Sequence, residues 1–376
     1  MSACDVLIVG AGPAGSAAAA TLATAGRRTL VLEKDRFPRA KVCGEFLSGS
    51  ARADLRRLGV LADVEAGAEH IERGFLHLSR SRSVPFELPA AALGISRSRL
   101  DNLLARRAAA LGAEVRHGAR VTSIERGAGS GFQVRFVVDG LASSLEARSV
   151  IGAWGRWDPL DRGLKRRFLA GGSRFFGWSR DFVGGGDRLA GQVHLFLFPG
   201  GYCGLSRVEG GATNLAGVIS ERTRRRLDSG WEAVVAHARR SSTALDGAMA
   251  HLSEGPGEFL GIGPVFFTVK PPVENRMLMV GDAAGVIDPF SGEGQAGALR
   301  SGILAAEILS QGFDGLISMD DVARDYALAW RRCFAPRFGW GSVFRRFMLQ
   351  PAAAKLAALV AGPRLVHFAM DRMRAE

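Results

Sequence analysis

A glycine-rich turn near the N-terminus constrains this chain more than any other feature of its sequence. The segment Gly10–Gly15 has the sequence Gly-Ala-Gly-Pro-Ala-Gly and separates an apolar stretch, Asp5–Val9, from an alanine-rich stretch, Ser16–Ala25. A strand, a tight turn and a helix in that order place free N–H groups and the positive end of the helix dipole where an anion can bind. The pattern therefore predicts an α/β fold with a nucleotide-phosphate site at this turn.

A second predicted strand, Arg28–Glu33, supports this interpretation and narrows the nucleotide. It ends in an acidic residue about twenty positions after the glycines, where a carboxylate can accept hydrogen bonds from two ribose hydroxyls. An acid at this place disfavours a phosphorylated ribose, so FAD or NAD is expected rather than NADP. The residues predicted to bind the dinucleotide here are Gly10, Gly12, Pro13, Ala14, Gly15, Glu33 and Lys34.

The composition of the chain indicates a globular protein. A chain of 376 residues with 47% hydrophobic residues can bury a large core and is expected to form two closely joined domains. It contains no run of about twenty apolar residues, so neither a transmembrane span nor a signal peptide is predicted, and a cytoplasmic protein is expected. The net charge of +12 comes mostly from scattered arginines without the aromatic pattern of a nucleic-acid module, and no nucleic-acid partner is predicted.

The cysteines point to the same compartment. None of the four forms a Cys-x-x-Cys pair or has metal-ligand spacing, so we expect reduced thiols and no metal site. They are Cys4, Cys43, Cys203 and Cys333.

Along the chain, the strand and helix signals suggest a domain interrupted by an insertion. We expect a helix over 45–60, a pair of strands over 75–78 and 84–88, and a helix ending at Leu111. Between about 168 and 267, strand signals with glycine-rich turns predict a mostly antiparallel sheet. The expected units are a nucleotide-binding domain over 1–70, 94–165 and 268–320, a β-sheet substrate domain over 71–93 and 166–267, and a helical segment over 321–376.

A second signature lies far from the first, in the segment Gly281–Gly302. Its sequence begins Gly-Asp-Ala-Ala-Gly and continues through Asp-Pro and Ser-Gly-Glu-Gly into a predicted helix. Together with the N-terminal turn, it resembles the superfamily of FAD-dependent oxidoreductases similar to p-hydroxybenzoate hydroxylase. The resemblance implies a Rossmann-type FAD-binding domain with an inserted substrate domain. It also implies that the following residues contact FAD: Lys41, Arg97, Gly281, Asp282, Pro289, Gly292, Glu293 and Gly294.

In this superfamily, Asp282 would bind the ribityl chain of FAD. The helix that begins near Gly292–Gly294 would direct its N–H groups to the N1/C2=O edge of the flavin, where the reduced ring is negatively charged. Arg97 matches an Arg-x-x-Leu-Asp element expected beside the cofactor. Lys41 would pair with the FAD phosphates, or else be a solvated loop charge.

One branch of the superfamily resembles this chain further. The segment Phe37–Gly44 is similar to the Phe-Pro-Arg-x-Lys-x-Cys-Gly element of the geranylgeranyl reductase group, whereas Gly44-Glu45 is shared with flavin-dependent halogenases. The resemblance implies redox chemistry at a carbon–carbon double bond of an isoprenoid or polyketide-like substrate. The alternatives are a monooxygenase (hydroxylase or epoxidase) or a halogenase, each acting through a flavin C4a-hydroperoxide, and a non-catalytic binder of lipidated ligands. NAD(P)H or a flavin reductase would deliver the electrons.

Three residues are candidates for catalysis. Cys43 would lie near the flavin as a proton donor, or else pack as a small apolar residue. Glu45 would act as a general acid if burial raises its pKa, or else cap the following helix. Tyr202 would be the polar group of a substrate cavity.

Aromatic residues predict the nature of that cavity. Those of the inserted sheet would form an apolar wall that accepts a flat or elongated substrate. They are Phe175, Phe176, Trp178, Phe196, Phe198, Tyr202, Phe266 and Phe267. Near the C-terminus, the segment Pro336–Leu349 mixes basic and aromatic residues, which suits either contact with anionic lipid at a membrane surface or ordinary packing of a helix.

Overall fold

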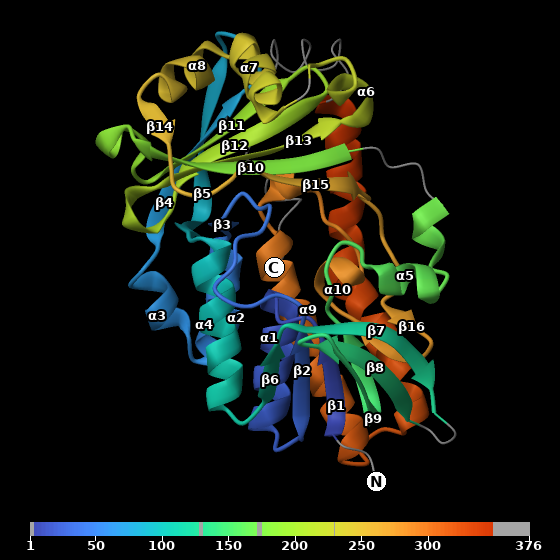
Figure 1. Cartoon of the computed structure of the whole chain (residues 1–376). Coiled ribbons are helices and arrows are strands. Elements are labelled where there is room, and N and C mark those ends of the chain that lie inside the picture. Colours follow the sequence, from blue (N-terminus) through green and yellow to red (C-terminus); the bar gives the residue numbers. More distant parts are fainter. Residues whose placement is uncertain (1–3, 128–130, 171–174, 229, 349–376) are drawn as a thin grey trace.

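Two β-sheets form the framework of the molecule, one above the other in Figure 1. The structure, a computed structural model, describes residues 4–127, 131–170, 175–228 and 230–348, and describes side chains as far as residue 338. Within these residues the lower sheet has eight strands and the upper sheet has nine. The α/β class and the antiparallel second sheet that the sequence predicts are both confirmed.

The lower sheet has a parallel centre, as expected for strands that are apolar on both faces. β1 pairs in parallel with β2 and with β9, and β2 pairs in parallel with β6. Its strands are β1 (Cys4–Val9), β2 (Thr29–Glu33), β6 (Glu114–His117), β7 (Ala119–Arg126), β8 (Phe132–Val138), β9 (Leu141–Gly152), β16 (Val273–Glu274) and β17 (Met277–Met279).

Helices cover this sheet, and two of them come very close to each other. α1 (Pro13–Thr24) packs on α9 (Gly294–Phe313), although almost the whole chain separates them. At the crossing, a Cβ on Gly302 would lie 2.1 Å from the carbonyl oxygen of Ala14, so only glycine allows this approach. α9 in turn contacts α10 (Met319–Met348), and α4 (Arg97–Ala110) contacts α1.

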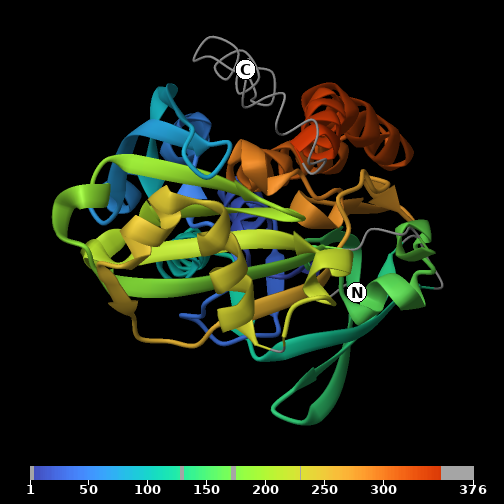
Figure 2. The ribbon, with the colours of Figure 1, turned by 90° about the horizontal axis from the view of Figure 1, so that it is seen from above.

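The upper sheet is antiparallel except where β4 pairs with β11. The helices α7 (Trp231–Ser241) and α8 (Thr243–Met249) lie across its outer face, which is the near face in Figure 2. Its strands are β3 (Phe46–Leu47), β4 (Glu69–His77), β5 (Ser83–Gly94), β10 (Phe175–Gly184), β11 (Gln192–Phe198), β12 (Gly201–Arg207), β13 (Thr213–Ser220), β14 (Leu252–Glu254) and β15 (Leu260–Val265).

One predicted helix is only partly present. The sequence predicts a helix over 45–60, but the helix α2 begins at Arg52 and ends at Leu58. Glu45 has a left-handed backbone with φ of 52°, which a helix cannot continue. Phe46 and Leu47 then pair with β5 as an edge strand, so the sheet takes residues that helical periodicity assigns to a helix.

The described part of α10 ends at Met348, and the segment Leu349–Glu376 lies outside the described residues. The predicted membrane or packing role of the basic and aromatic segment therefore falls largely on positions whose side chains are not described. Among the helices that the structure describes, none is both long enough and apolar enough to cross a membrane.

Candidate active site

A cavity of about 320 Å³ lies between the two sheets. Its floor includes the N-terminal ends of α1 and α9, and its roof is the inner face of the upper sheet. The loop that carries Val42, Cys43 and Gly44 forms part of the wall. The two glycine signatures, which are almost three hundred positions apart in the sequence, thus border one hollow.

The first signature forms a tight turn that only glycine permits at two places. Gly10 has φ of +104°, and a Cβ on this residue would lie 2.6 Å from the carbonyl oxygen of Ala153. A Cβ on Gly15 would lie 1.9 Å from the carbonyl oxygen of Gly10. Both residues shape the turn from behind, whereas Gly12, Pro13 and Ala14 line the cavity. No side chain caps α1 at Gly12, so the N–H groups of its first turn are open to an anion.

Glu33, although predicted to bind FAD, does not line the cavity, and its carboxylate binds backbone N–H groups. Oε2 accepts a hydrogen bond from the N–H of Ala11 at 2.7 Å, and Oε1 accepts one from the N–H of Asp35 at 2.9 Å. The side chain therefore holds the glycine turn in shape. Lys34 does line the cavity, and its Nζ lies 3.2 Å from the carboxylate of Asp158.

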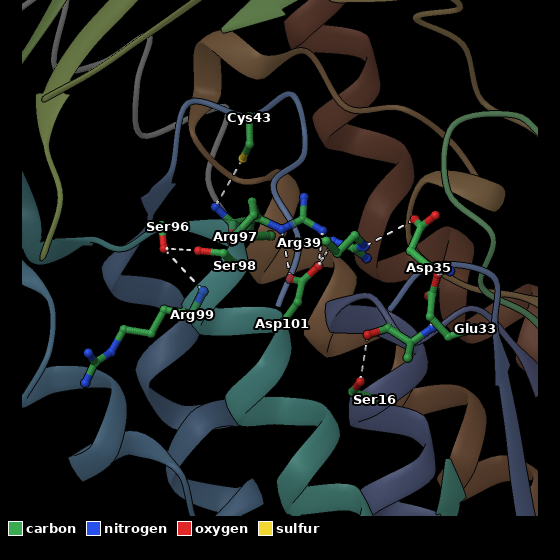
Figure 3. A network of polar contacts seen from close by, with 12 residues as sticks. Ser16, Glu33, Asp35, Arg39, Cys43, Ser96, Arg97, Ser98, Arg99 and Asp101 are labelled. Carbon is green, nitrogen blue, oxygen red and sulfur yellow. Dashed lines mark hydrogen bonds and ion pairs between the residues drawn. The ribbon is translucent and has the colours of Figure 1, made fainter. Parts of the chain in front are cut away.

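Arg97 lies beside the Gly10–Gly15 turn and belongs to a buried ionic network (Figure 3). Its Nε and Nη2 donate to the two carboxylate oxygens of Asp101 at 2.8 and 2.7 Å, and Arg39 donates to the same carboxylate at 2.7 Å. Burial alone would raise the pKa of Asp101, but the two guanidinium groups lower it on balance. Asp101 is the acid of the Arg-x-x-Leu-Asp element, so the sequence carried a signal for this partner.

Lys41 adds a second cation to this wall of the cavity. Within the described residues its ammonium makes no hydrogen bond or ion pair, and it lines the cavity. Burial lowers its pKa to about 8, and the positive charges of Arg39 and Arg97 contribute to the shift. A bound anion would reverse this effect, so the geometry suits the predicted phosphate contact.

Cys43 lines the cavity with its sulfur held by N–H donors. Sγ accepts from the N–H of Glu45 at 3.4 Å and from Nε2 of Gln295 at 3.5 Å. The positive charge of Arg97 also acts on the thiol. Burial raises the pKa of the thiol even though Arg97 opposes the shift, so Cys43 keeps its proton at neutral pH.

Glu45 is buried behind the loop and does not line the cavity. Oε1 accepts from the N–H of Arg97 at 2.9 Å, while Oε2 has no hydrogen-bond partner in the described part of the chain. Burial raises its pKa to about 8; the charges of Asp181 and Glu209 add to the rise, and the Arg97 N–H opposes it. The carboxyl group therefore favours its protonated form at neutral pH, although Glu45 is not among the residues that line the cavity.

The second signature borders the cavity from the other side. Asp282 forms an ion pair with Arg156, whose Nε lies 3.5 Å away, and both residues line the cavity together with Gly281, Pro289, Gly292 and Gly294. No side chain caps α9, so its first N–H groups face the cavity as those of α1 do. Glu293 differs from this set, because it is fully buried and Oε2 accepts from the hydroxyl of Ser50 at 2.9 Å.

Tyr202 of β12 lines the cavity and connects the upper sheet with the turn before α9. Its hydroxyl donates to Oδ1 of Asp288 at 2.6 Å, and its ring packs edge-on against Phe290. Asp288 also caps the turn before α9, since the same oxygen accepts from the N–H of Phe290. Tyr202 was predicted from the sequence as a polar group of the cavity, whereas the role of Asp288 as its partner was not.

The roof of the cavity is apolar, but most of the aromatic residues predicted for it lie elsewhere. Of the eight, only Trp178 and Tyr202 line the cavity, while Phe196 and Phe198 pack on the outer face with α7. Successive residues of a strand point to opposite faces, so the roof is formed by residues of opposite parity. Its apolar side chains include Phe86, Leu88, Val193, Leu195, Val218, Ile262 and Val265.

The floor of the cavity fits FAD. A diphosphate would find N–H donors at the two uncapped helix ends and cations at Lys41 and Arg97. The Arg97 guanidinium is close to the turn, since its Nη2 lies 3.8 Å from where a Cβ of Gly12 would be. In contrast, no group of three or more His, Cys, Asp or Glu side chains among the described residues is placed to hold a metal ion.

Comparison with known proteins agrees with this fit. Residues 3–178 match the family described as FAD binding domain. A menaquinone reductase of Mycobacterium tuberculosis is 29% identical over 362 residues, covering 92% of this chain and 83% of that protein. Digeranylgeranylglycerophospholipid reductase 2 of Methanosphaera stadtmanae is 25% identical, covering 82% of this chain and 78% of that protein.

The fold is also similar to that of a solved flavin-dependent brominase. The TM-score is 0.81 at 20% sequence identity, covering 98% of this chain and 93% of the brominase. Reductases and halogenases thus share this architecture, so the fold alone does not choose between their reactions.

Proposed function

We propose that this chain, an FAD-dependent oxidoreductase whose residues 3–178 match the FAD binding domain family, reduces a carbon–carbon double bond of a hydrophobic substrate. The substrate class that we infer is an isoprenoid or polyketide-like molecule. Two relatives support the proposal, because one is named a menaquinone reductase and the other a digeranylgeranylglycerophospholipid reductase.

The division of the cavity into two chemically different halves carries this proposal. The floor offers N–H groups and cations, among them Lys41 and Arg97, whereas the roof is built from apolar side chains of the upper sheet. A hydrophobic chain would gain about 25 cal/mol for every Å² of apolar surface that it buries against this roof. A double bond in such a chain would then lie over the floor, where the cofactor is held.

Cys43 lines this cavity, and we infer that it is the proton donor. When bound, reduced FAD supplies a hydride from its N5 atom, with electrons that come from NAD(P)H or a reductase. One alkene carbon gains that hydride and the other gains the proton of the Cys43 thiol, so the substrate is reduced by two electrons. Because both described hydrogen bonds of Sγ, from the Glu45 N–H and from Gln295, use the sulfur as an acceptor, the S–H group remains available to donate to the substrate.

A single-turnover reduction without oxygen tests the proposed reaction. The FAD-loaded protein is reduced under nitrogen and mixed with menaquinone or with a geranylgeranyl lipid, and the product mass is measured. We expect flavin reoxidation together with a product that has gained two hydrogens. Reoxidation that occurs only with oxygen, with an oxygen atom or a halogen added to the product, would contradict reduction and favour the alternatives.

The cysteine is tested in the same assay. We expect Cys43→Ser to slow the reduction of the double bond by about 100-fold, since a serine hydroxyl is a much weaker acid than a thiol. The matched control is Cys333→Ser, because Cys333 is exposed on α10 and should have no effect. Equal rates for Cys43→Ser and the unmodified protein would remove Cys43 from the mechanism.

A further inference from the structure

A buried lysine joins the two turns that form the floor of the cavity. Lys270 is 1% exposed, and its Nζ donates hydrogen bonds to the backbone carbonyl oxygens of Arg156 and Asp282, the latter at 2.7 Å. The two carbonyls lie 114 and 12 residues away from Lys270 in the sequence. The ammonium group thus bridges segments that no local interaction would bring together.

Both bridged segments line the cavity. The first carries Gly155, Arg156 and Trp157, and the second carries Gly281 and Asp282. The backbone of Lys270 contributes a further link, because its N–H donates to the carbonyl oxygen of Ala284 at 3.0 Å. Lys270 therefore fixes the distance between the two turns from behind, without touching the cavity itself.

The surroundings of Lys270 hold the ammonium in place without neutralising it. The ring of Phe168 lies under it at 4.3 Å, and the guanidinium of Arg166 donates to the neighbouring carbonyl of Ala283 at 2.9 Å. Within the described residues, Lys270 forms no ion pair with a carboxylate. Burial lowers its pKa to about 8, although Asp282 and Asp161 oppose the shift from a greater distance.

A charge in such a place does not help the chain to fold. Desolvation of an ammonium costs several kcal/mol, and the two hydrogen bonds that Lys270 donates to carbonyl oxygens offset only part of this cost. A methionine would fill the same space. The charge is therefore better explained by what it does to the two turns than by a contribution to stability.

We propose that Lys270 is a positioning residue for the cofactor: it holds the Arg156 turn and the Asp282 turn at the separation that FAD requires. The Asp282 carboxylate and the Arg156 guanidinium are presented to the cavity by these two turns. The inference concerns the capture of FAD, so it does not depend on which reaction the bound cofactor then performs.

The experiment compares Lys270→Met with Lys165→Met, which changes an exposed lysine. Apoprotein is titrated with FAD, and binding is followed by quenching of flavin fluorescence. In parallel, the thermal unfolding of each apoprotein is measured. For Lys270→Met we expect the Kd for FAD to rise about tenfold or more, a loss of at least about 1.4 kcal/mol. We expect the Tm of the apoprotein to stay within about 3 °C or to rise.

This combination separates a positioning residue from a structural one. An unchanged Kd, or a weaker Kd accompanied by a much lower apoprotein Tm, would overturn the proposal. If Lys270→Met does not fold, the same two measurements are applied to Lys270→Gln, whose amide can still donate to one carbonyl. A smaller loss of FAD affinity at an unchanged Tm then supports the proposal, and failure of this variant to fold overturns it.

Discussion

At the scale of single residues, the site depends on charges that burial has changed. Glu45 is 5% exposed, and its Oε2 has no hydrogen-bond partner in the described structure. A carboxyl group in this position keeps its proton at a pH where an exposed one would lose it. That difference links the stability of the fold to pH.

Glu45→Gln should remove this pH dependence. The pKa of Glu45 is about 8 in the folded protein and about 4.5 in the unfolded chain. Between these values the folded state binds more protons, so this residue's contribution to stability is full below pH 4.5 and is lost as the pH rises to 8. We expect the unmodified apoprotein to lose on the order of 3 kcal/mol of unfolding free energy between pH 5 and 8 relative to Glu45→Gln.

Urea unfolding at the two pH values measures this difference. The control is Glu258→Gln, because Glu258 is exposed and should not change the slope with pH. The assignment of a neutral Glu45 would be wrong if the unmodified protein and Glu45→Gln showed parallel pH profiles.

At the scale of elements, the crossing of α1 and α9 brings both anion-binding helix ends to one cavity. It depends on the missing side chain of Gly302, whose Cβ would meet the carbonyl oxygen of Ala14 at 2.1 Å. Backbone cannot yield there as a flexible side chain would, so any larger residue must force the helices apart.

Gly302→Ala is therefore expected to destabilise the protein by roughly 1–3 kcal/mol and to weaken FAD binding. Gly247 in α8 is the matched control, because no atom lies within 4 Å of where its Cβ would be. Alanine favours a helix by up to about 1 kcal/mol over glycine, so Gly247→Ala should stabilise slightly. Thermal unfolding of both variants tests the contrast, and equal shifts of the same sign would refute it.

The elements also show what a sequence can and cannot predict. Gly10, Gly12 and Gly15 predicted the strand, turn and helix correctly, because the constraint is local. Phe196 and Phe198 were expected on the wrong face of the upper sheet, since alternation does not tell which face meets the cavity. The position of Lys270 could not be predicted, because its partners are backbone carbonyls brought together only by folding.

At the scale of the whole molecule, the cofactor site has two ends that belong to different parts of the chain. We expect the α1 end, with its N–H groups, Lys41 and Arg97, to bind the diphosphate, and the N–H groups of the α9 end to bind the flavin ring. A ligand that reaches both ends should stabilise the fold more than one that reaches a single end. FAD and FMN differ in this respect, because FMN lacks the adenosine phosphate half.

We expect FAD at 100 times its Kd to raise the unfolding free energy by about 2.7 kcal/mol. FMN at the same concentration should give a clearly smaller increase, because it brings only one phosphate and no adenosine to the α1 end. Calorimetry of the apoprotein with each ligand measures both values. Equal stabilisation by FAD and FMN would show that the α1 end does not bind the cofactor.

The crossing of α1 with α9 also bears on biosynthesis. A nascent polypeptide that has left the ribosome only as far as Glu293 already contains β1, α1 and β2, yet it lacks the second helix against which Ala14 rests. FAD can contact both helix ends only after α9 has packed beside α1. We therefore expect cofactor loading to wait until translation has passed α9.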